Sequence, residues 1–309
     1  MTDDVTQCFE DHRIHLLGLA YRMLGEMAAA EDVVQEAWLR WRNAQHRDIR
    51  NPRGWLSTIA IRIALDALRS ARKRRETYVG PWLPEPILPD DTRAFTADSP
   101  AAHAELASDL SLALLYVLER LSPEERAAFI LHDAFDRDYD EIASALGKSE
   151  AACRKLVSRA RERVRRDHPR QTVSKDQHAQ ILMKFAQATA MQDGDALGRV
   201  FAPDIVFYSD GGGRVPAALK PIFGTDKVQR LILGLMRKSM PSGTATLAPL
   251  EINGRPGLVV SVDGAIYSAL DIETDGERIV AVYLLRNPEK LARLEGALMS
   301  SAHGSSASA

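Results

Sequence analysis

The chain has few cysteines and no long apolar run. Cys8 and Cys153 are its two cysteines among 309 residues, too few for a disulfide framework or a cysteine-based zinc cluster. No uninterrupted apolar run exceeds seven residues, as in 112–118, whereas a membrane-spanning helix needs about 20. The first ten residues carry Asp3, Asp4 and Glu10 around no apolar centre, unlike a secretory signal. We therefore expect a cytoplasmic protein whose domains depend on packing and which holds no metal or other cofactor.

Charges are segmented along the chain, although their sum is close to zero. Lys and Arg number 40 and Asp and Glu 42, a net charge of -2. Residues 52–75 hold seven basic side chains and one acidic, and residues 148–170 hold nine and three. Residues 77–147 between them hold four basic and fourteen acidic side chains. The total would argue against nucleic-acid binding, but two separate basic segments favour it.

Helical periodicity predicts a compact first domain. Apolar residues recur at helical spacing over 9–24 and 28–41. A polar loop over 43–51 precedes Pro52, a favoured first-turn residue, and an apolar stripe follows from Trp55 to Leu68. The other faces of this third helix are basic, and the loop is rich in Arg, His and Asn, which can hold phosphates and unstacked bases. The alternative is a surface helix that happens to be basic.

A proline-rich linker and a second helical domain follow. Five of the fifteen prolines, at positions 81, 84, 86, 89 and 100, lie in an acidic segment that we expect to be extended. A second helical domain begins near residue 104. Within it, the sequence from Ser122 to Glu125 predicts a helix N-cap, a first-turn proline and an acidic first turn.

Residues 139–166 fit a helix-turn-helix. A short helix over 139–146 ends at Gly147, which can adopt a left-handed turn, and Ser149 caps a longer helix. Cys153 and Leu156 are expected to face the core. Such a unit inserts the start of its second helix into the major groove of DNA. An ordinary helical hairpin with a solvated basic face is the alternative.

The pattern changes after about residue 171. Helices are expected over 177–191 and 225–240, a strand over 205–208, and four strands over 244–252, 258–262, 265–272 and 279–285. Asn253-Gly254, Asp263-Gly264 and Asp275-Gly276 are hairpin signals between these strands. We therefore expect an α+β domain with a curved antiparallel sheet.

An enzymatic third domain is the competing hypothesis. Acidic, basic and phenolic side chains that could line a pocket are Tyr208, Asp210, Arg214, Asp263, Tyr267 and Tyr283. The domain holds one histidine, His178 on its first helix, and no recognisable catalytic dyad. The Gly211-Gly212-Gly213 sequence more simply serves a tight turn or a close backbone approach. We therefore expect no catalysis.

Two parts of the chain carry, in order, motifs of one known family. Residues 30–75, with Ala30-Glu31-Asp32-Val33-Val34-Gln35-Glu36 and Asn51-Pro52-Arg53-Gly54-Trp55-Leu56, resemble region 2 of the bacterial extracytoplasmic-function sigma factors. Residues 121–161, with Leu-Ser-Pro-Glu-Glu-Arg and Val157-Ser158-Arg159-Ala160-Arg161, resemble region 4. Trp82-Leu83-Pro84-Glu85-Pro86, Asp210-Gly211-Gly212-Gly213-Arg214 and Asn287-Pro288-Glu289-Lys290-Leu291 are similar to motifs of the group with a SnoaL-like C-terminal extension.

The resemblance implies sets of binding residues and no catalytic or metal-binding ones. The residues expected to bind the polymerase clamp are Asp32, Gln35, Glu36, Leu39 and Arg40. The -10 element is expected on Asn43, Arg47, Arg50, Asn51, Arg53, Trp55 and Arg62, and the -35 element on Ser149, Glu150, Arg154, Lys155, Ser158 and Arg159. A regulatory set comprises Trp82, Pro84, Glu85, Pro86, Asp210, Gly211, Gly212, Gly213, Arg214, Asn287, Pro288, Glu289, Lys290 and Leu291.

A physical argument supports the regulatory set. Trp82 is a large apolar side chain without a local core, so it needs a partner surface. The turn at 210–214 offers backbone amides and a cation that could receive Glu85, and residues 287–291 could brace the same surface. The alternative is that Trp82 packs on the helices of the second domain.

These observations predict a multidomain fold: two all-α domains and a C-terminal α+β domain resembling the SnoaL-like cone-shaped barrel. The expected boundaries are 7–76 for region 2, 77–103 for the linker, 104–168 for region 4, 172–295 for the SnoaL-like domain and 296–309 for a disordered tail. The resemblance implies a sigma factor that brings core RNA polymerase to promoter DNA, has no membrane partner and is modulated by its own third domain. The alternative is a DNA-binding regulator fused to a small-molecule-binding or cyclase-like domain, and a small ligand in the pocket of that domain stays an open possibility.

Overall fold

The computed structural model describes residues 2–75, 77–89, 95, 110–167, 173–239 and 245–295. It forms two compact units. The first comprises Met1–Thr77, Asp90–Leu110 and Leu114–Pro169, and the second comprises Tyr78–Pro89, Ser111–Ala113 and Arg170–Ala309. The expected disordered tail over 296–309, and the expected linker at 90–94 and 96–103, lie outside the described residues. The first part of the linker, 78–89, therefore belongs to the same unit as the C-terminal domain.

The first unit begins with the three expected helices. They are α1 (Thr2–Leu24), α2 (Met27–Arg42) and α3 (Pro52–Arg75), and a short 3-10 helix, η1 (His46–Asp48), lies in the polar loop. Most apolar positions of the sequence pattern are buried where these helices meet, among them Phe9, Val33 and Leu56, whereas Ile14 is 44% exposed. Helix α1 begins earlier than expected, and the indole N–H of Trp41 donates to the carbonyl of Val5 at 2.9 Å, which ties its first turns to α2.

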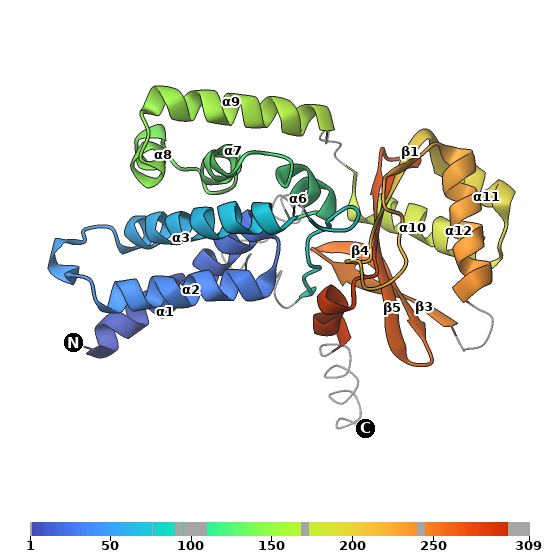
Figure 1. Cartoon of the computed structure of the whole chain (residues 1–309), viewed down its shortest axis with the longest axis horizontal. Helices are drawn as coiled ribbons and strands as arrows, with labels where there is room; N and C mark the ends of the chain where they lie inside the picture. The colour runs from blue at the N-terminus through green and yellow to red at the C-terminus, as the bar shows by residue number, and fades with distance from the viewer. Residues whose placement is uncertain are drawn as a thin grey trace. The chain divides into compact units, whose positions relative to one another are not determined.

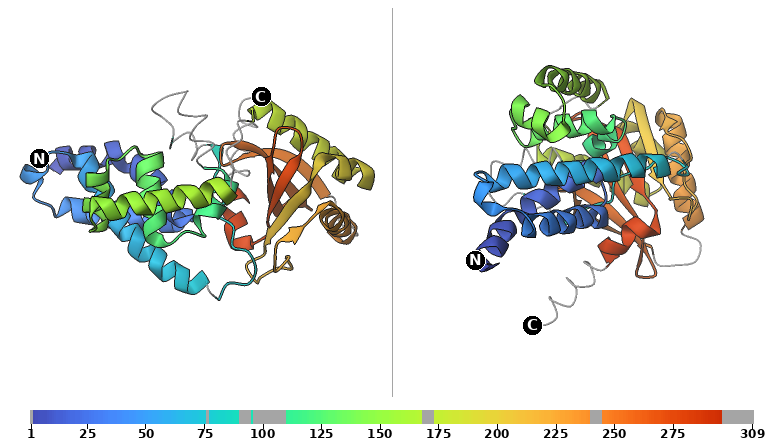
Figure 2. Two further views of the ribbon diagram at one scale, coloured as in Figure 1. Left: turned by 90° about the horizontal axis from the view of Figure 1, so that it is seen from above. Right: turned by 60° about the vertical axis from the view of Figure 1, so that its left-hand side comes forward.

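The second half of this unit contains the helix-turn-helix. Its elements are α6 (Leu112–Leu118), α7 (Pro123–Phe129), the π-helical turn η2 (Ile130–Ala134), α8 (Tyr139–Leu146) and α9 (Glu150–Asp167). The capping box at Ser122 is present, because Ser122 and Glu125 each accept from the other's backbone N–H. Gly147 ends α8 with a φ of 63°, the left-handed turn expected for glycine. Helices α7 and α8 both pack against α3 (Figures 1 and 2).

The second unit is an α+β domain. Its elements are α10 (Lys175–Ala190), α11 (Gly194–Val200), β1 (Phe201–Asp210), β2 (Ile222–Phe223), α12 (Thr225–Ser239), β3 (Ala245–Ile252), β4 (Arg255–Val262), β5 (Ala265–Thr274) and β6 (Ile279–Leu285). One sheet runs in the order β2-β1-β6-β5-β4-β3. The three helices pack against one face of it (Figure 1), with a core that includes Phe185, Phe201 and Val282.

The expectation of a wholly antiparallel sheet is wrong for one pair of strands. Strands β1 and β6 are parallel, with Phe207 opposite Val282 and Asp210 opposite Leu285. The hairpins from β3 to β6 are antiparallel as expected. The last of these strands, β6, is the one that pairs with β1. Parallel pairing makes β1 and β6 end at the same edge of the sheet. The loops after Asp210 and after Leu285 therefore start side by side.

The expected fold class, helical regions followed by an α+β domain, is confirmed. Asn253-Gly254 and Asp263-Gly264 both have positive φ at both residues and form two-residue turns, the type that suits a hairpin. The third turn is longer, because β5 ends at Thr274 and β6 begins at Ile279. Within the described ranges, no helix is both long and apolar enough to cross a membrane.

Candidate nucleic-acid interface and linker site

The set expected to bind polymerase lies along one side of α2. Val33, Val34, Ala37 and Trp41 are buried on the opposite side of the helix. Asp32, Gln35, Leu39 and Arg40 are exposed and Glu36 is half-buried. Arg40 and Glu36 form an ion pair at 2.9 Å, one helical turn apart. Leu39 is an exposed apolar residue in an otherwise charged strip, a composition suited to a protein partner.

The set expected at the -10 element lies on η1, its flanking loop and α3. Asn43, Arg50, Asn51, Arg53 and Arg62 are exposed, while Trp55 is half-buried against Trp41 with ring centroids 5.5 Å apart. The side chain of Asn51 accepts from the backbone N–H of Gly54 at 3.0 Å and so caps the start of α3. The side chain of Arg47 lies outside the described residues.

A half-buried histidine supports the start of α3. Nε2 of His15 lies 3.0 Å from the hydroxyl of Ser57, and Nδ1 of His15 lies 3.3 Å from the guanidinium of Arg53. Burial, and then the charge of Arg53, lower the pKa of His15 to about 3. His15 is therefore neutral at physiological pH and acts as a hydrogen-bonding neighbour of Arg53.

Arg62 is engaged by α8 in this structure. Its guanidinium donates to the carbonyl of Ser144 at 2.7 Å and to the carbonyl of Ala145 at 3.1 Å. These carbonyls lie in the last turn of α8, where a cation is favoured by the helix dipole. The donors of one residue expected at the -10 element are thus held by the helix-turn-helix.

The set expected at the -35 element lies on the exposed face at the start of α9. Ser149, Glu150, Arg154, Lys155, Ser158 and Arg159 are all exposed, and Cys153, Leu156, Val157 and Ala160 are buried on the other face. Arg154 forms an ion pair with Glu150 at 2.7 Å and lies 4.9 Å from the ring centre of Tyr139. Arg159 pairs with Glu125 at 3.1 Å. The face therefore presents oriented cations at the helix end that a major groove would receive.

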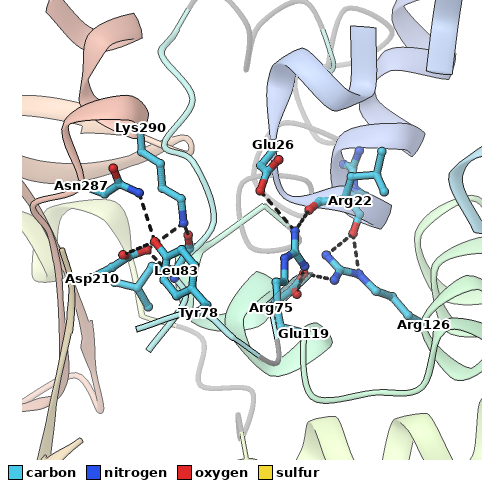
Figure 3. Close-up of polar contacts among 11 residues, drawn as sticks. Arg22, Glu26, Arg75, Tyr78, Leu83, Glu119, Arg126, Asp210, Asn287 and Lys290 are labelled. Atoms are coloured by element: carbon cyan, nitrogen blue, oxygen red, sulfur yellow. Dashed lines mark hydrogen bonds and ion pairs between the residues drawn. The ribbon is translucent and has the colours of Figure 1, made fainter. Parts of the chain in front are cut away.

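A buried arginine cluster, which the sequence pattern did not indicate, joins the two halves of the first unit (Figure 3). Arg126 on α7 is 1% exposed and donates to the carbonyl of Arg22 on α1 at 3.0 and 2.8 Å. Arg126 and Arg75 both form ion pairs with Glu119, and Arg75 also donates to the carbonyl of Leu24 at 2.8 Å. Nothing in the local spacing distinguishes these arginines from surface ones, so the cluster needs the tertiary structure to be seen.

Asp210 is the centre of a second polar cluster, in the second unit (Figure 3). Its side chain is fully buried at the end of β1. Oδ1 accepts from the hydroxyl of Tyr78 at 2.6 Å and from the N–H of Gly212 at 3.0 Å. Oδ2 accepts from the N–H of Leu83 at 2.9 Å and from Nζ of Lys290 at 2.7 Å. Two of these four donors come from the linker segment, so the carboxylate binds the linker directly. We call Tyr78, Leu83, Asp210, Asn287 and Lys290 the linker site.

Lys290 and Asn287 complete the linker site from beyond β6. The ammonium group of Lys290 donates to the carbonyl of Leu83 and lies 4.0 Å from the ring centre of Trp82, within range of a cation–π interaction. Nδ2 of Asn287 donates to the hydroxyl of Tyr78 at 3.1 Å. Trp82 is 9% exposed, and its contact with Lys290 lies within the second unit.

The triple glycine at 211–213 is required because neighbouring side chains approach its backbone closely. Gly212 has a φ of 63°, and a Cβ there would lie 2.5 Å from Nδ2 of Asn287. Gly213 has a φ of 70°, and its Cβ would lie 3.3 Å from the side chain of Val79 in the linker. Arg214 pairs with Glu289 at 2.6 Å on the surface, with side chains 66% and 67% exposed. Asp210 therefore receives the linker, through its contacts with Tyr78 and Leu83.

The linker also pairs with the turn after β3. The backbone N–H of Asn253 donates to the carbonyl of Ile87 at 2.9 Å, and Oδ1 of Asn253 accepts from the N–H of Ile87 at 3.1 Å. Pro84 and Pro86 are buried beside these contacts, and Glu85 is half-buried. Tyr78 and Asn253 were not predicted from the sequence, because Tyr78 precedes the linker motif and Asn253 has the pattern of a turn residue. Among the described residues, no group of three or more His, Cys, Asp or Glu side chains is placed to hold a metal ion.

Comparison with known proteins agrees with both halves of the first unit. The Sigma-70 region 2 family matches residues 8–74 and the Sigma-70 region 4 family matches residues 111–164. The chain is 40% identical over 291 residues to the ECF RNA polymerase sigma factor SigJ of Mycobacterium tuberculosis, covering 91% of each chain. It is 32% identical over 298 residues to the probable ECF sigma factor SigI of the same species, covering 96% of this chain and 98% of that one.

A solved structure covers nearly the whole chain. The crystal structure of Mycobacterium tuberculosis SigJ aligns with a TM-score of 0.72 and 38% identity, covering 92% of this chain and 97% of SigJ. The likeness thus spans the helical domains and the C-terminal α+β domain together, at an identity high enough to establish common descent. The chain belongs to the extracytoplasmic-function family of RNA polymerase sigma factors.

Proposed function

We propose that this sigma factor contacts the polymerase clamp through the exposed strip of α2 and reads its promoter with two separate surfaces. Sigma factors are transcription initiation factors that bind core RNA polymerase and promoter DNA and catalyse no reaction themselves. The loop before α3 and the exposed residues of α3 are the -10 surface, and the exposed start of α9 is the -35 surface. Support comes from the exposure of these residues on faces opposite the buried core. Because core polymerase and chromosomal DNA are its partners, we place the protein in the cytoplasm.

Promoter binding at the -10 surface requires a change at Arg62. Its donors are held by the carbonyls of Ser144 and Ala145, so they can contact a phosphate only after α8 moves away. We therefore infer that region 2 and region 4 separate before both promoter elements are held. Arg62→Ala removes both the contact with α8 and the promoter contact. Weaker binding of the Arg62→Ala holoenzyme to promoter DNA would support the promoter contact, and unchanged or tighter binding would contradict it.

The C-terminal domain is proposed to regulate this sigma factor by holding the linker. The observation that carries the proposal is Asp210, a fully buried carboxylate that binds Tyr78 and Leu83 of the linker. A linker held in this way fixes how much chain is free between region 2 and region 4. That length limits the promoter spacings at which both elements can be reached together.

The test is transcription by reconstituted holoenzyme from promoters whose -35 and -10 elements are separated by different lengths. Asp210→Asn weakens the linker site, and Arg214→Gln on the nearby surface is the matched control, because its ion pair is exposed. We expect Asp210→Asn to change both transcript yield and the preferred spacing, and Arg214→Gln to change neither. Equal yield and equal spacing preference for Asp210→Asn and the unmodified protein would contradict a regulatory linker site.

The proposed domain boundaries follow from the same contacts. Region 2 over 7–76 and region 4 over 104–168 are the promoter-binding domains, and 172–295 is the regulatory domain. The segment 78–89 is proposed to act as part of the regulatory domain, because its described contacts at Asp210, Lys290 and Asn253 are with that domain.

A further inference from the structure

The C-terminal domain contains an apolar cavity of about 250 Å³ that is partly open to solvent. Helices α10 and α12 and five strands of the sheet supply its walls, including Phe185, Phe207, Ile232, Leu258 and Leu284. Protein interiors are normally packed without voids larger than a water molecule. An apolar cavity of this size therefore forgoes packing energy, unless something of matching chemistry fills it.

One charged side chain lines this apolar space. Among the described residues around the cavity, Arg286, which follows β6, is the sole charged one, and it is 8% exposed. Its guanidinium donates to the carbonyl of Pro216 and to the hydroxyl of Tyr267, and it lies 4.4 Å from the ring centre of Tyr267. These contacts hold the guanidinium in place through neutral groups.

The guanidinium lacks a carboxylate partner among the described residues, and its Nε–H has no hydrogen-bond acceptor there. Burying a cation without an anion is costly, since Coulomb attraction normally offsets the loss of hydration. The cavity thus offers an apolar volume and a positive charge that no carboxylate of the described residues compensates.

We propose that this cavity binds a small apolar carboxylate, of the kind represented by a straight-chain fatty acid. The chain fills the apolar volume, and the carboxylate lies against the guanidinium of Arg286 and supplies the missing negative charge. An amine would place a second cation beside Arg286, and an alcohol would leave the charge uncompensated. The cavity wall contains no Asp, Glu or His among the described residues, so the site is one for binding, without turnover of the ligand. The proposal concerns occupancy of the cavity and does not depend on the regulatory role of the linker site.

The test is isothermal titration calorimetry of the full chain with decanoate, decan-1-ol and decylamine, each kept below its micelle-forming concentration. We expect one-to-one binding of decanoate and about tenfold or more weaker binding of the other two, since a charge-assisted hydrogen bond is lost. Decanol or decylamine binding as tightly as decanoate would overturn the role of Arg286. Absence of decanoate binding would overturn the proposal as a whole.

Variants of the chain test separately the charge of Arg286 and the volume of the cavity. Arg286→Gln should weaken decanoate by about tenfold or more and leave decanol unchanged, while Arg286→Lys should retain part of the preference for decanoate. Val260→Trp should abolish binding of both ligands by filling the cavity, without touching the hydrogen bonds of Arg286. Arg278→Gln, at an exposed position near the start of β6, is the matched control and should bind as the unmodified chain does. Decanoate binding unchanged in folded Val260→Trp would place the ligand elsewhere and overturn the assignment.

Discussion

Nζ of Lys290 lies 2.7 Å from Oδ2 of Asp210, and the two side chains are 8% and 0% exposed. The residues are 80 positions apart in sequence. They meet because β1 and β6 are parallel and end at the same edge of the sheet. The linker carbonyl of Leu83 and the ring of Trp82 then lie against the ammonium group. The buried ion pair of Asp210 and Lys290 thus also holds the linker, whose residue Leu83 lies 127 positions before Asp210.

Lys290→Met should destabilise the second unit strongly. It leaves the carboxylate of Asp210 buried without a cation, and loss of one partner of a buried pair costs about 3–5 kcal/mol in other proteins. The exposed pair of Arg214 and Glu289 provides the control, and Glu289→Gln should change the free energy of unfolding by less than about 1 kcal/mol. Urea unfolding measures both. Similar small losses for the two variants would mean that Asp210 and Lys290 are not coupled as the distances indicate.

Gly212→Ala should release the linker. A second variant, Gly264→Ala, separates the effect of the contact with Asn287 from that of backbone strain. Gly212 and Gly264 both have positive φ, but a Cβ at Gly264 meets nothing within 4 Å, whereas a Cβ at Gly212 would lie 2.5 Å from Asn287. Gly264→Ala therefore reports backbone strain alone, about 1 kcal/mol. Gly212→Ala should cost more and should also expose residues 78–88 to limited proteolysis. Equal proteolysis of the two variants would show that the contact with Asn287 does not hold the linker.

Asp271 should make a contribution to the free energy of unfolding that falls as pH rises from about 4 to 7. Its sign is opposite to that of His15, whose lowered pKa favours folding as pH rises. Burial, aided by Glu273 and opposed by Arg255, raises the pKa of Asp271 from 3.8 to about 7. In this window the folded chain keeps a proton that the unfolded chain releases, so higher pH favours unfolding. Each pKa unit corresponds to about 1.4 kcal/mol, so the loss is on the order of a few kcal/mol. Urea unfolding of the protein and of Asp271→Asn at pH 5 and pH 8 measures this contribution, as the difference between the two pH dependences.

Asp271→Asn should remove that fall and stabilise the folded chain at pH 8. Asp204→Asn, at an exposed site on β1, is the control and should leave the pH dependence as it is. An identical pH dependence in Asp271→Asn and in the unmodified chain would show that Asp271 makes no such contribution.

Arg154→Ala and Lys155→Ala should weaken binding to the -35 element. A side chain that reads a base changes sequence preference, by about 1–3 kcal/mol for a good bidentate contact, whereas a phosphate contact lowers affinity for every sequence and flattens the salt dependence. Arg165→Ala, at the other end of α9, is the control. Holoenzyme binding to promoters with altered -35 sequences, at several salt concentrations, distinguishes these roles. Unchanged binding for both variants would remove the start of α9 from the -35 surface.

Local features of the fold were predictable from the sequence, because their causes are local. The capping box at Ser122, the left-handed turn at Gly147 and the two-residue turns at Asn253 and Asp263 each depend on a few adjacent residues. The exposed faces of α2 and α9 follow from helical periodicity. Helix α11 and the short strand β2 were missed, since they are too short to show a period.

The long-range contacts could not be predicted, because no group of adjacent residues in the sequence indicates them. Tyr78 and Asn287 are 209 positions apart, and Arg126 looks like a surface residue of a charged helix until α1 covers it. The parallel pairing of β1 with β6 was also beyond reach, because hairpin turns indicate only neighbouring strands. The motifs around Trp82, Asp210 and Asn287 marked the right segments, but Tyr78, Leu83 and Asn253 contribute contacts that no motif contained.

The placement of residues 78–89 in the same compact unit as the C-terminal domain has an evolutionary consequence. The surface that receives this segment is incomplete without it, so the two cannot be inherited as independent modules. Selection should act on both together, and lineages that lose the acidic residue at 210 should lose the lysine at 290 and the tyrosine at 78 as well, because co-varying positions report spatial contact. A gene fusion that joined this domain to a different sigma factor would function only if it carried its own linker along.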